Sequence, residues 1–204
     1  MMVKQSSASL AYLIILLLLS ALVVGCASSP PVRYYSLQPN EPVMENDAEN
    51  SIIVRLGPLR IPEYLKRTQI VTRTDNAEVI IDDFSRWAEP LDQAMHSVIA
   101  SNLDSLLSNV IVVAYPHITS IDFDYWILGS VSRFDADVNG KVTLIMQWGL
   151  MDSERNTILA PLRRRFESQA ANSNDPGAIA TAMSDVLNQF SHEIAEQLDS
   201  AIDR

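Results

Sequence analysis

One side chain in the sequence has neighbours that specify its chemistry. Cys26 is the only cysteine of the 204-residue chain, and it follows Val23-Val24-Gly25 at the end of an apolar run. This order matches a lipobox, in which the cysteine thiol accepts a diacylglyceryl group and the small residue before it permits cleavage. A lone cysteine elsewhere would more simply be a buried apolar residue. The sequence therefore predicts lipidation of Cys26, with the membrane as a partner reached through acyl chains.

The segment before Cys26 has the organisation of a secretion signal. Lys4 is its only charged residue, and Leu10–Val24 is apolar apart from Ser20. A membrane-spanning helix needs about 20 apolar residues, so an uncleaved anchor is the weaker alternative. We expect residues 1–25 to be a cleaved signal peptide, residues 26–33 a lipidated tether and residues 34–204 the folded domain.

The tether and the net charge limit the partners of the mature chain. Seven extended residues, Ala27–Arg33, span at most about 23 Å, which keeps the domain near the membrane. Removal of the signal, which contains one lysine and no acid, changes the net charge from −10 to −11. Nucleic acids and anionic membrane faces attract basic surfaces, so neither is expected to bind. Ala27 is not the aspartate that commonly retains lipoproteins in the inner membrane, so we expect the outer membrane, facing the periplasm.

Two patterns could suggest a metal site. Asp135–Gly140 (DADVNG) copies the first half of a calcium loop, but the twelfth position, where a bidentate glutamate belongs, is Met146. The better interpretation is a β-hairpin in which Asn139 and Gly140 form a type I′ turn. The three histidines lie far apart and none pairs with another at i, i+4, so we interpret them as solvated or locally bonded: His96, His117 and His192.

Enzymatic motifs are missing from the sequence. It contains no G-x-S-x-G elbow, P-loop or G-x-G-x-x-G fingerprint, so we expect no catalytic residue, no metal and no cofactor. An enzyme would have to use scattered carboxylates such as Asp82-Asp83 or Asp122 and Asp124. Charged residues in loops are more often simply solvated.

One basic cluster stands out in this acidic chain. Arg163 and Arg165 share a face at strand spacing, and Arg164 opposes them. An exposed strand end with a surface charge patch is the simpler interpretation. The alternative is that Arg163 and Arg165 contact an acidic partner. Trp87–Leu91 (WAEPL) could likewise be a partner surface, although core packing is the better interpretation of an aromatic side chain at a helix start.

Apolar periodicity predicts the order strands, helix, strands, helix. Val142, Leu144, Met146, Trp148 and Leu150 alternate as in a half-buried antiparallel strand. The expected strands are 34–37, 51–59, 69–74, 78–82, 109–115, 125–134, 141–151 and 157–167, and the expected helices run from Pro90 to Leu107 and from Asp175-Pro176 to Ile202. Both helices have a single apolar stripe. We therefore expect an α+β, two-layer domain, with a largely antiparallel sheet and two amphipathic helices packed on one face.

Three motifs carry a resemblance. Ile61–Leu65 (IPEYL), Ile70–Thr74 (IVTRT) and Trp87–Leu91 (WAEPL) follow the lipobox in an order that resembles the PqiC/YmbA-like ABC-type transport auxiliary lipoproteins. The resemblance implies a non-enzymatic accessory component of an MCE-type system that moves lipids between the two membranes. It also implies binding to the periplasmic MCE protein, and a homo-oligomer that matches a ring-shaped MCE assembly is compatible with it. Cys26 is the one functional residue that the resemblance transfers.

Two other classes of protein stay open at this stage: a periplasmic hydrolase and a structural envelope lipoprotein. A concave apolar pocket with convergent polar groups would favour the enzyme. An exposed apolar patch with a polar rim would favour the adaptor.

Overall fold

The structure is a computed structural model that describes residues 12, 29–39, 51–76, 78–116 and 122–203. The chain divides into two compact units, Met1–Pro31 and Val32–Arg204. Tyr12 and residues 29–31 are the described part of the first unit, so the predicted signal peptide and Cys26 lie outside the described residues. The second unit starts within two residues of the expected domain start. Among the described helices, none is long and apolar enough to cross a membrane.

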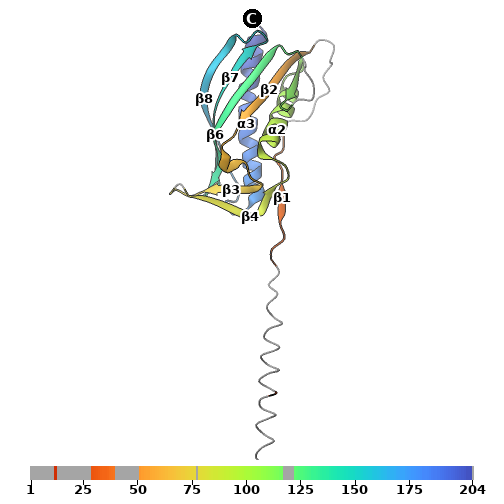
Figure 1. Cartoon of the computed structure of the whole chain (residues 1–204). Coiled ribbons are helices and arrows are strands. Elements are labelled where there is room, and N and C mark those ends of the chain that lie inside the picture. The colour runs from red at the N-terminus through yellow and green to blue at the C-terminus, as the bar shows by residue number, and fades with distance from the viewer. Residues whose placement is uncertain (1–11, 13–28, 40–50, 77, 117–121, 204) are drawn as a thin grey trace, which may run out of the picture. The chain divides into compact units, whose positions relative to one another are not determined.

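An eight-stranded sheet forms the second unit (Figure 1). Five strands lie in the order β5-β2-β6-β7-β8. The β3–β4 hairpin pairs with the last two residues of β6, and β1 pairs with β4. The strands are β1 Arg33–Tyr35, β2 Ile52–Arg60, β3 Gln69–Arg73, β4 Val79–Trp87, β5 Val110–Ala114, β6 Tyr125–Asp137, β7 Lys141–Asp152 and β8 Thr157–Gln169. The most extensive pairings, β6–β7 and β7–β8, are antiparallel, as is β3–β4. β2 pairs in parallel with β5 and β6, so the sheet is mixed.

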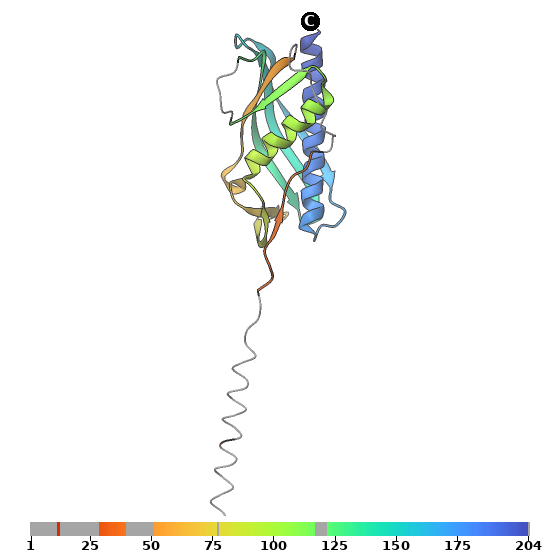
Figure 2. The same ribbon diagram turned by 90° about the vertical axis from the view of Figure 1, so that its right-hand side faces the viewer.

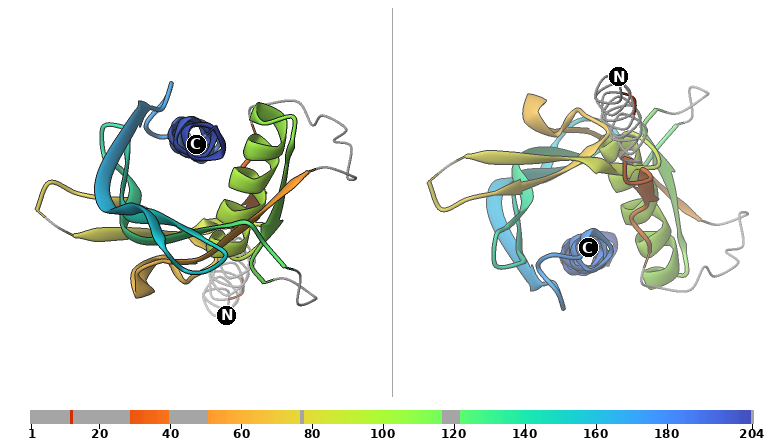
Figure 3. Two further views of the ribbon diagram at one scale, coloured as in Figure 1. Left: turned by 90° about the horizontal axis from the view of Figure 1, so that it is seen from above. Right: turned by 90° about the horizontal axis from the view of Figure 1, so that it is seen from below.

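Both long helices cover one face of this sheet (Figure 2). α2 spans Leu91–Leu106 and contacts β2 and β5, while α3 spans Pro176–Ile202 and contacts β6, β7 and β8. Figure 3 shows the sheet curling around α3 with α2 beside it. A short 3-10 helix, η2, covers Glu63–Leu65. The predicted α+β domain with two amphipathic helices on one face is therefore confirmed.

Local sequence signals explain the helix ends. The side chain of Asp175 accepts the Gly177 N–H at 3.0 Å, and Pro176 opens the helix, as the sequence predicts. Pro90 is instead the residue before α2, in an extended conformation, so its expected place as first helical residue is off by one.

The core lies between the helices and the inner face of the sheet. The five alternating residues of β7 are at most 1% exposed, which confirms their predicted side: Val142, Leu144, Met146, Trp148 and Leu150. The Trp148 ring packs edge-on against Phe190 of α3, with centroids 5.7 Å apart, and its indole N–H donates to Glu193 at 3.0 Å. Trp87 is 4% exposed, which confirms core packing as the interpretation of this aromatic side chain.

Candidate functional site

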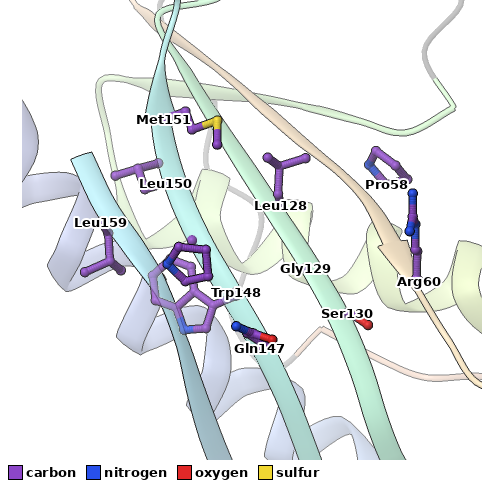
Figure 4. A pocket seen from close by; sticks show the side chains of 12 residues that line it. Pro58, Arg60, Leu128, Gly129, Ser130, Gln147, Trp148, Leu150, Met151 and Leu159 are labelled. Carbon is purple, nitrogen blue, oxygen red and sulfur yellow. The ribbon is translucent and has the colours of Figure 1, made fainter. Parts of the chain in front are cut away.

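The outer face of the sheet, away from the helices, is hollowed where β2, β6, β7 and β8 meet (Figure 4). The hollow has a volume of about 340 Å³. Its lining is mainly apolar, with three polar side chains: Pro58, Leu128, Gly129, Gly149, Met151, Leu159 and Pro161, together with Arg60, Ser130 and Gln147. Trp148 and Leu150 belong to the same stretch of β7, but their side chains are at most 1% exposed and pack in the core. This described lining contains no carboxylate and no histidine, so it offers no acid–base pair.

Gly149 explains why the hollow exists. A Cβ atom at this position would lie 3.0 Å from the Leu159 carbonyl oxygen and 3.4 Å from Pro161. Such contacts would force β8 to move, and any larger side chain would occupy the space between the strands. The absence of a side chain at Gly149 therefore keeps the floor of the hollow open.

The basic cluster adjoins this hollow. Arg163 pairs in register with Gln147, which lines the hollow, and Arg165 pairs with Ile145 on the same strand. Arg164 points to the helix side, where its Nε lies 2.9 Å from Glu193 of α3. The predicted division of the three arginines between two faces is therefore confirmed.

The two outer arginines differ in their neighbours. Arg165 lies 2.6 Å from Glu167, which also pairs with Lys141 at 2.7 Å. The hydrogen bond from Lys141, followed by that from Arg165, lowers the pKa of Glu167. Arg163 has no ion-pair partner within the described part of the chain. With Arg60 on β2, it places positive charge at two borders of an apolar hollow.

The carboxylate of Asp135 is the centre of a buried charge network. Asp135 is completely buried. Its carboxylate accepts hydrogen bonds from Tyr64 Oη at 2.8 Å, Arg73 Nη2 at 3.0 Å and Arg133 Nε at 2.7 Å. The Arg73 guanidinium also lies over the Tyr64 ring, 5.1 Å from its centroid. Burial, followed by the hydrogen bond to Asp135, raises the pKa of Tyr64 to about 12, and the same carboxylate raises the pKa of Arg73. One carboxylate thus joins η2, β3 and β6, and its removal would leave two partly buried arginines without their partner.

Sequence reasoning missed this network, although a signal was present. Tyr64 belongs to the IPEYL motif and Arg73 to the IVTRT motif, and both meet Asp135 in space. Two of the three motifs that carry the resemblance are thus joined by one buried carboxylate. No spacing rule relates residues 64, 73 and 135, so only the fold could bring them together.

The false calcium loop is a hairpin, as interpreted from the sequence. Asp137 Oδ1 accepts the backbone N–H groups of Asn139 at 2.8 Å and Lys141 at 3.0 Å, so this carboxylate stabilises the turn. The turn type, however, differs from the expectation. Gly140 has φ +80°, whereas Asn139 has a negative φ, so this is not a type I′ turn. The loop between β6 and β7 has three residues, 138–140, and its last residue, Gly140, has the left-handed conformation.

The remaining candidates have local structural roles. His96 is buried, and its Nε2 accepts the Leu59 N–H at 3.0 Å, so the interpretation of a locally bonded histidine is confirmed for it. His117 lies outside the described residues. Asp124 accepts the Ile53 N–H at 2.8 Å, and Asp82 accepts the Phe84 N–H at 2.9 Å, so these carboxylates fix nearby backbone.

Comparisons with known proteins agree with this architecture. Residues 35–195 match the family described as ABC-type transport auxiliary lipoprotein component. The chain is 25% identical over 147 residues to the intermembrane transport lipoprotein PqiC of Escherichia coli, which covers 69% of this chain and 74% of that protein. The PqiC protein of Shigella flexneri matches equally well.

Two solved structures have the same fold. A crystal structure of an uncharacterized protein superposes with a TM-score of 0.67 at 22% identity, covering 83% of this chain and 99% of that one. A protein of Xanthomonas campestris gives a TM-score of 0.61 at 20% identity, with the same coverage. Because the family match covers most of the chain and includes all three motifs, this protein belongs to the ABC-type transport auxiliary lipoproteins, the family that its motifs resemble.

Proposed function

We propose that this chain is a non-enzymatic accessory lipoprotein of an intermembrane lipid transport system, and that it docks onto the periplasmic MCE protein. Cys26 carries the acyl chains after cleavage of residues 1–25, and the protein faces the periplasm from the outer membrane. Family membership and the name of the PqiC relatives support the accessory role. Self-association into a ring stays a prediction.

One observation carries the docking part of the proposal: an apolar hollow with positive charges at its border on the open face of the sheet. Stable protein contacts typically have a desolvated apolar centre surrounded by a polar rim. Arg60 and Arg163 supply such a rim on opposite sides of the hollow, and they favour an acidic segment of the partner. Two of the carboxylates that a hydrolase would use, Asp82 and Asp124, accept backbone N–H groups, which supports a binding role over an enzymatic one.

Affinity purification tests this proposal. The processed lipoprotein, extracted from envelopes in mild detergent, should retain an MCE protein. Arg163→Glu should weaken this binding at least about tenfold, the scale of a close charge pair across an interface. Arg155→Glu makes the same charge change in the exposed β7–β8 turn and serves as the matched control. Equal binding by both variants would remove Arg163 from the contact, and no MCE protein in any eluate would contradict the proposal.

A further inference from the structure

Exposed apolar side chains gather at one end of the domain. Among the described residues of the second unit, eight large apolar residues are exposed, and five of them lie on β4, on β1 or directly before β1: Val32, Tyr34, Ile80, Ile81 and Phe84. We call these five residues the tether-end surface. Their exposed fractions range from 39% to 65%. Isolated exposed apolar residues are normal, but a cluster of this kind marks an interaction surface.

The register of β1 places this surface beside the tether. β1 pairs in parallel with β4, with Arg33 opposite Ser85 and Tyr35 opposite Trp87. Pro30 and Pro31 lack amide hydrogens, so they cannot extend this pairing. The edge of β4 from Val79 to Phe84 is therefore left without a strand neighbour on that side among the described residues. In Figure 3, the view from below shows β4 crossing this end of the domain.

Chain length fixes which end of the domain meets the membrane. Six residues lie between Cys26 and β1, so Arg33, the first residue of β1, is at most about 23 Å from Cys26. α3 runs from this end to the opposite end, and its 27 residues measure about 40 Å. The opposite end is marked by Tyr125, whose hydroxyl bonds the Ala201 carbonyl oxygen at 3.2 Å. A domain tethered at β1 therefore presents the tether-end surface, and not the opposite end, to the bilayer.

We infer that the tether-end surface is a second membrane contact, in which the side chains of β4 enter the interfacial layer of the bilayer. This inference rests on the proposed lipidation of Cys26. Ile80 and Ile81 point to opposite faces of the hairpin because side chains alternate along a strand. Both residues also border a recess of about 360 Å³ at the start of α3, so the choice of the bilayer rests on the reach of the tether and not on their alternation. Headgroups and interfacial water satisfy the free backbone groups of that edge.

The local charges agree with a zwitterionic surface. The two strands β1 and β4 carry two positive and two negative charges, Arg33, Arg86, Asp82 and Asp83, so together they are neutral although the mature chain has a net charge of −11. Strands without net charge neither repel zwitterionic lipids nor require anionic ones. The tether-end surface thus relies on apolar contact, and its binding should respond little to salt.

A single-thiol probe tests the inference. The thiol of Cys26 is acylated in the processed protein, so Ile81→Cys introduces one reactive thiol, which is labelled with a polarity-sensitive fluorophore. The lipoprotein is reconstituted into phosphatidylethanolamine–phosphatidylcholine vesicles at about one copy per vesicle. The label should shift to the blue and be quenched by nitroxide lipids severalfold more than the label on Ile158→Cys. Ile158 is exposed near the opposite end of the domain and is the matched control.

Two serine substitutions and mass spectrometry of the acyl chains distinguish a failure of this inference from a failure of the proposed anchor. Ile80→Ser and Phe84→Ser, added to Ile81→Cys, should return the label to a water-like emission while the melting temperature stays close to that of the parent. If mass spectrometry finds the acyl chains but the label at position 81 reports water, the inference fails and the proposed anchor stands. A signal that appears only at high protein density would assign the surface to a second copy and overturn the inference. Absence of acyl chains would overturn both.

Discussion

The buried His96 makes the stability of the domain depend on pH. Its side chain is 3% exposed, its Nε2 accepts the Leu59 N–H, and its Nδ1 lies 2.5 Å from the Asp92 carbonyl oxygen. These partners require the neutral tautomer, with the proton on Nδ1. Burial lowers the pKa of His96 below its ordinary value of 6.5, and the Asp92 carbonyl opposes this shift only in part. In the protonated ring, Nε2 also carries a hydrogen, so it faces the Leu59 N–H as a second donor and the hydrogen bond between them is lost.

The sign and size of the effect follow from proton linkage. As the pH falls below 6.5, the unfolded chain binds a proton at this position before the folded chain does. The contribution of His96 is therefore complete above pH 6.5 and is lost as the pH decreases toward the lower, folded pKa. One proton changes the free energy of unfolding by about 1.4 kcal/mol per pH unit within this window. At pH 5.5 the loss should be at most about 1.4 kcal/mol, which corresponds to a decrease of up to roughly 3–6 °C in melting temperature for a domain of this size.

Urea unfolding between pH 7 and pH 5.5 measures the effect, with tryptophan fluorescence as the signal. His96→Gln removes the titrating group, so the variant should lose stability at pH 7 but show a smaller slope with pH. Subtraction of the two curves cancels the titration of all other groups. His192→Gln, on the exposed side of α3, makes the same change of side chain and is the matched control. Parallel curves for the natural chain and His96→Gln would refute the assigned role of His96.

Three further predictions concern the charge network, the β6–β7 turn and the anchor. Asp135→Asn should destabilise the fold by about 3–5 kcal/mol in urea unfolding, because it leaves two arginines partly buried without their carboxylate; a loss under 1 kcal/mol, comparable to a surface ion pair, would contradict the network. Gly140→Val should cost about 1–2 kcal/mol or more, since Gly140 has φ +80° and a Cβ there would lie 3.0 Å from Ser173. Millimolar calcium should leave the melting temperature unchanged, and a rise of several degrees would reinstate the calcium loop. Cys26→Ala should abolish both signal cleavage and incorporation of labelled palmitate; palmitate that still enters the variant would refute Cys26 as the acceptor.

Local periodicity was enough to predict most elements. The alternation of β7 and the apolar stripe of α3 depend on neighbours within a few residues, so both could be assigned with the correct buried side. β4 was predicted to end at Asp82 but continues to Trp87, because Asp82-Asp83 interrupts the apolar pattern. Its last three residues are held by pairing with β1, a contact that the local sequence does not encode.

The candidate surfaces depend on contacts between distant segments. The arginine cluster could be assigned to two faces from strand spacing alone, but its position beside a hollow needs the register of Arg163 with Gln147. The hollow could not be predicted either, because it forms where Gly149 lies beside Pro161 and where β2 pairs with β6. The tether-end surface likewise needs the parallel pairing of Arg33 with Ser85. The sequence alone shows which residue types lie on each strand. Their neighbours depend on pairing between strands that are distant in the sequence.

The position of β6 in the sheet has a consequence for the order of folding. β6 borders β2, β3 and β7, so the strands of the first half of the chain obtain their shared neighbour only when residues 125–137 are available. α3, which covers the inner face of β6, β7 and β8, comes last of all. A growing chain therefore lacks a closed core until its C-terminal helix is complete, and such non-local topology folds slowly. For a protein that we propose is exported with a cleaved signal peptide, this order keeps the core open until the whole chain has been made, which leaves time for export before folding.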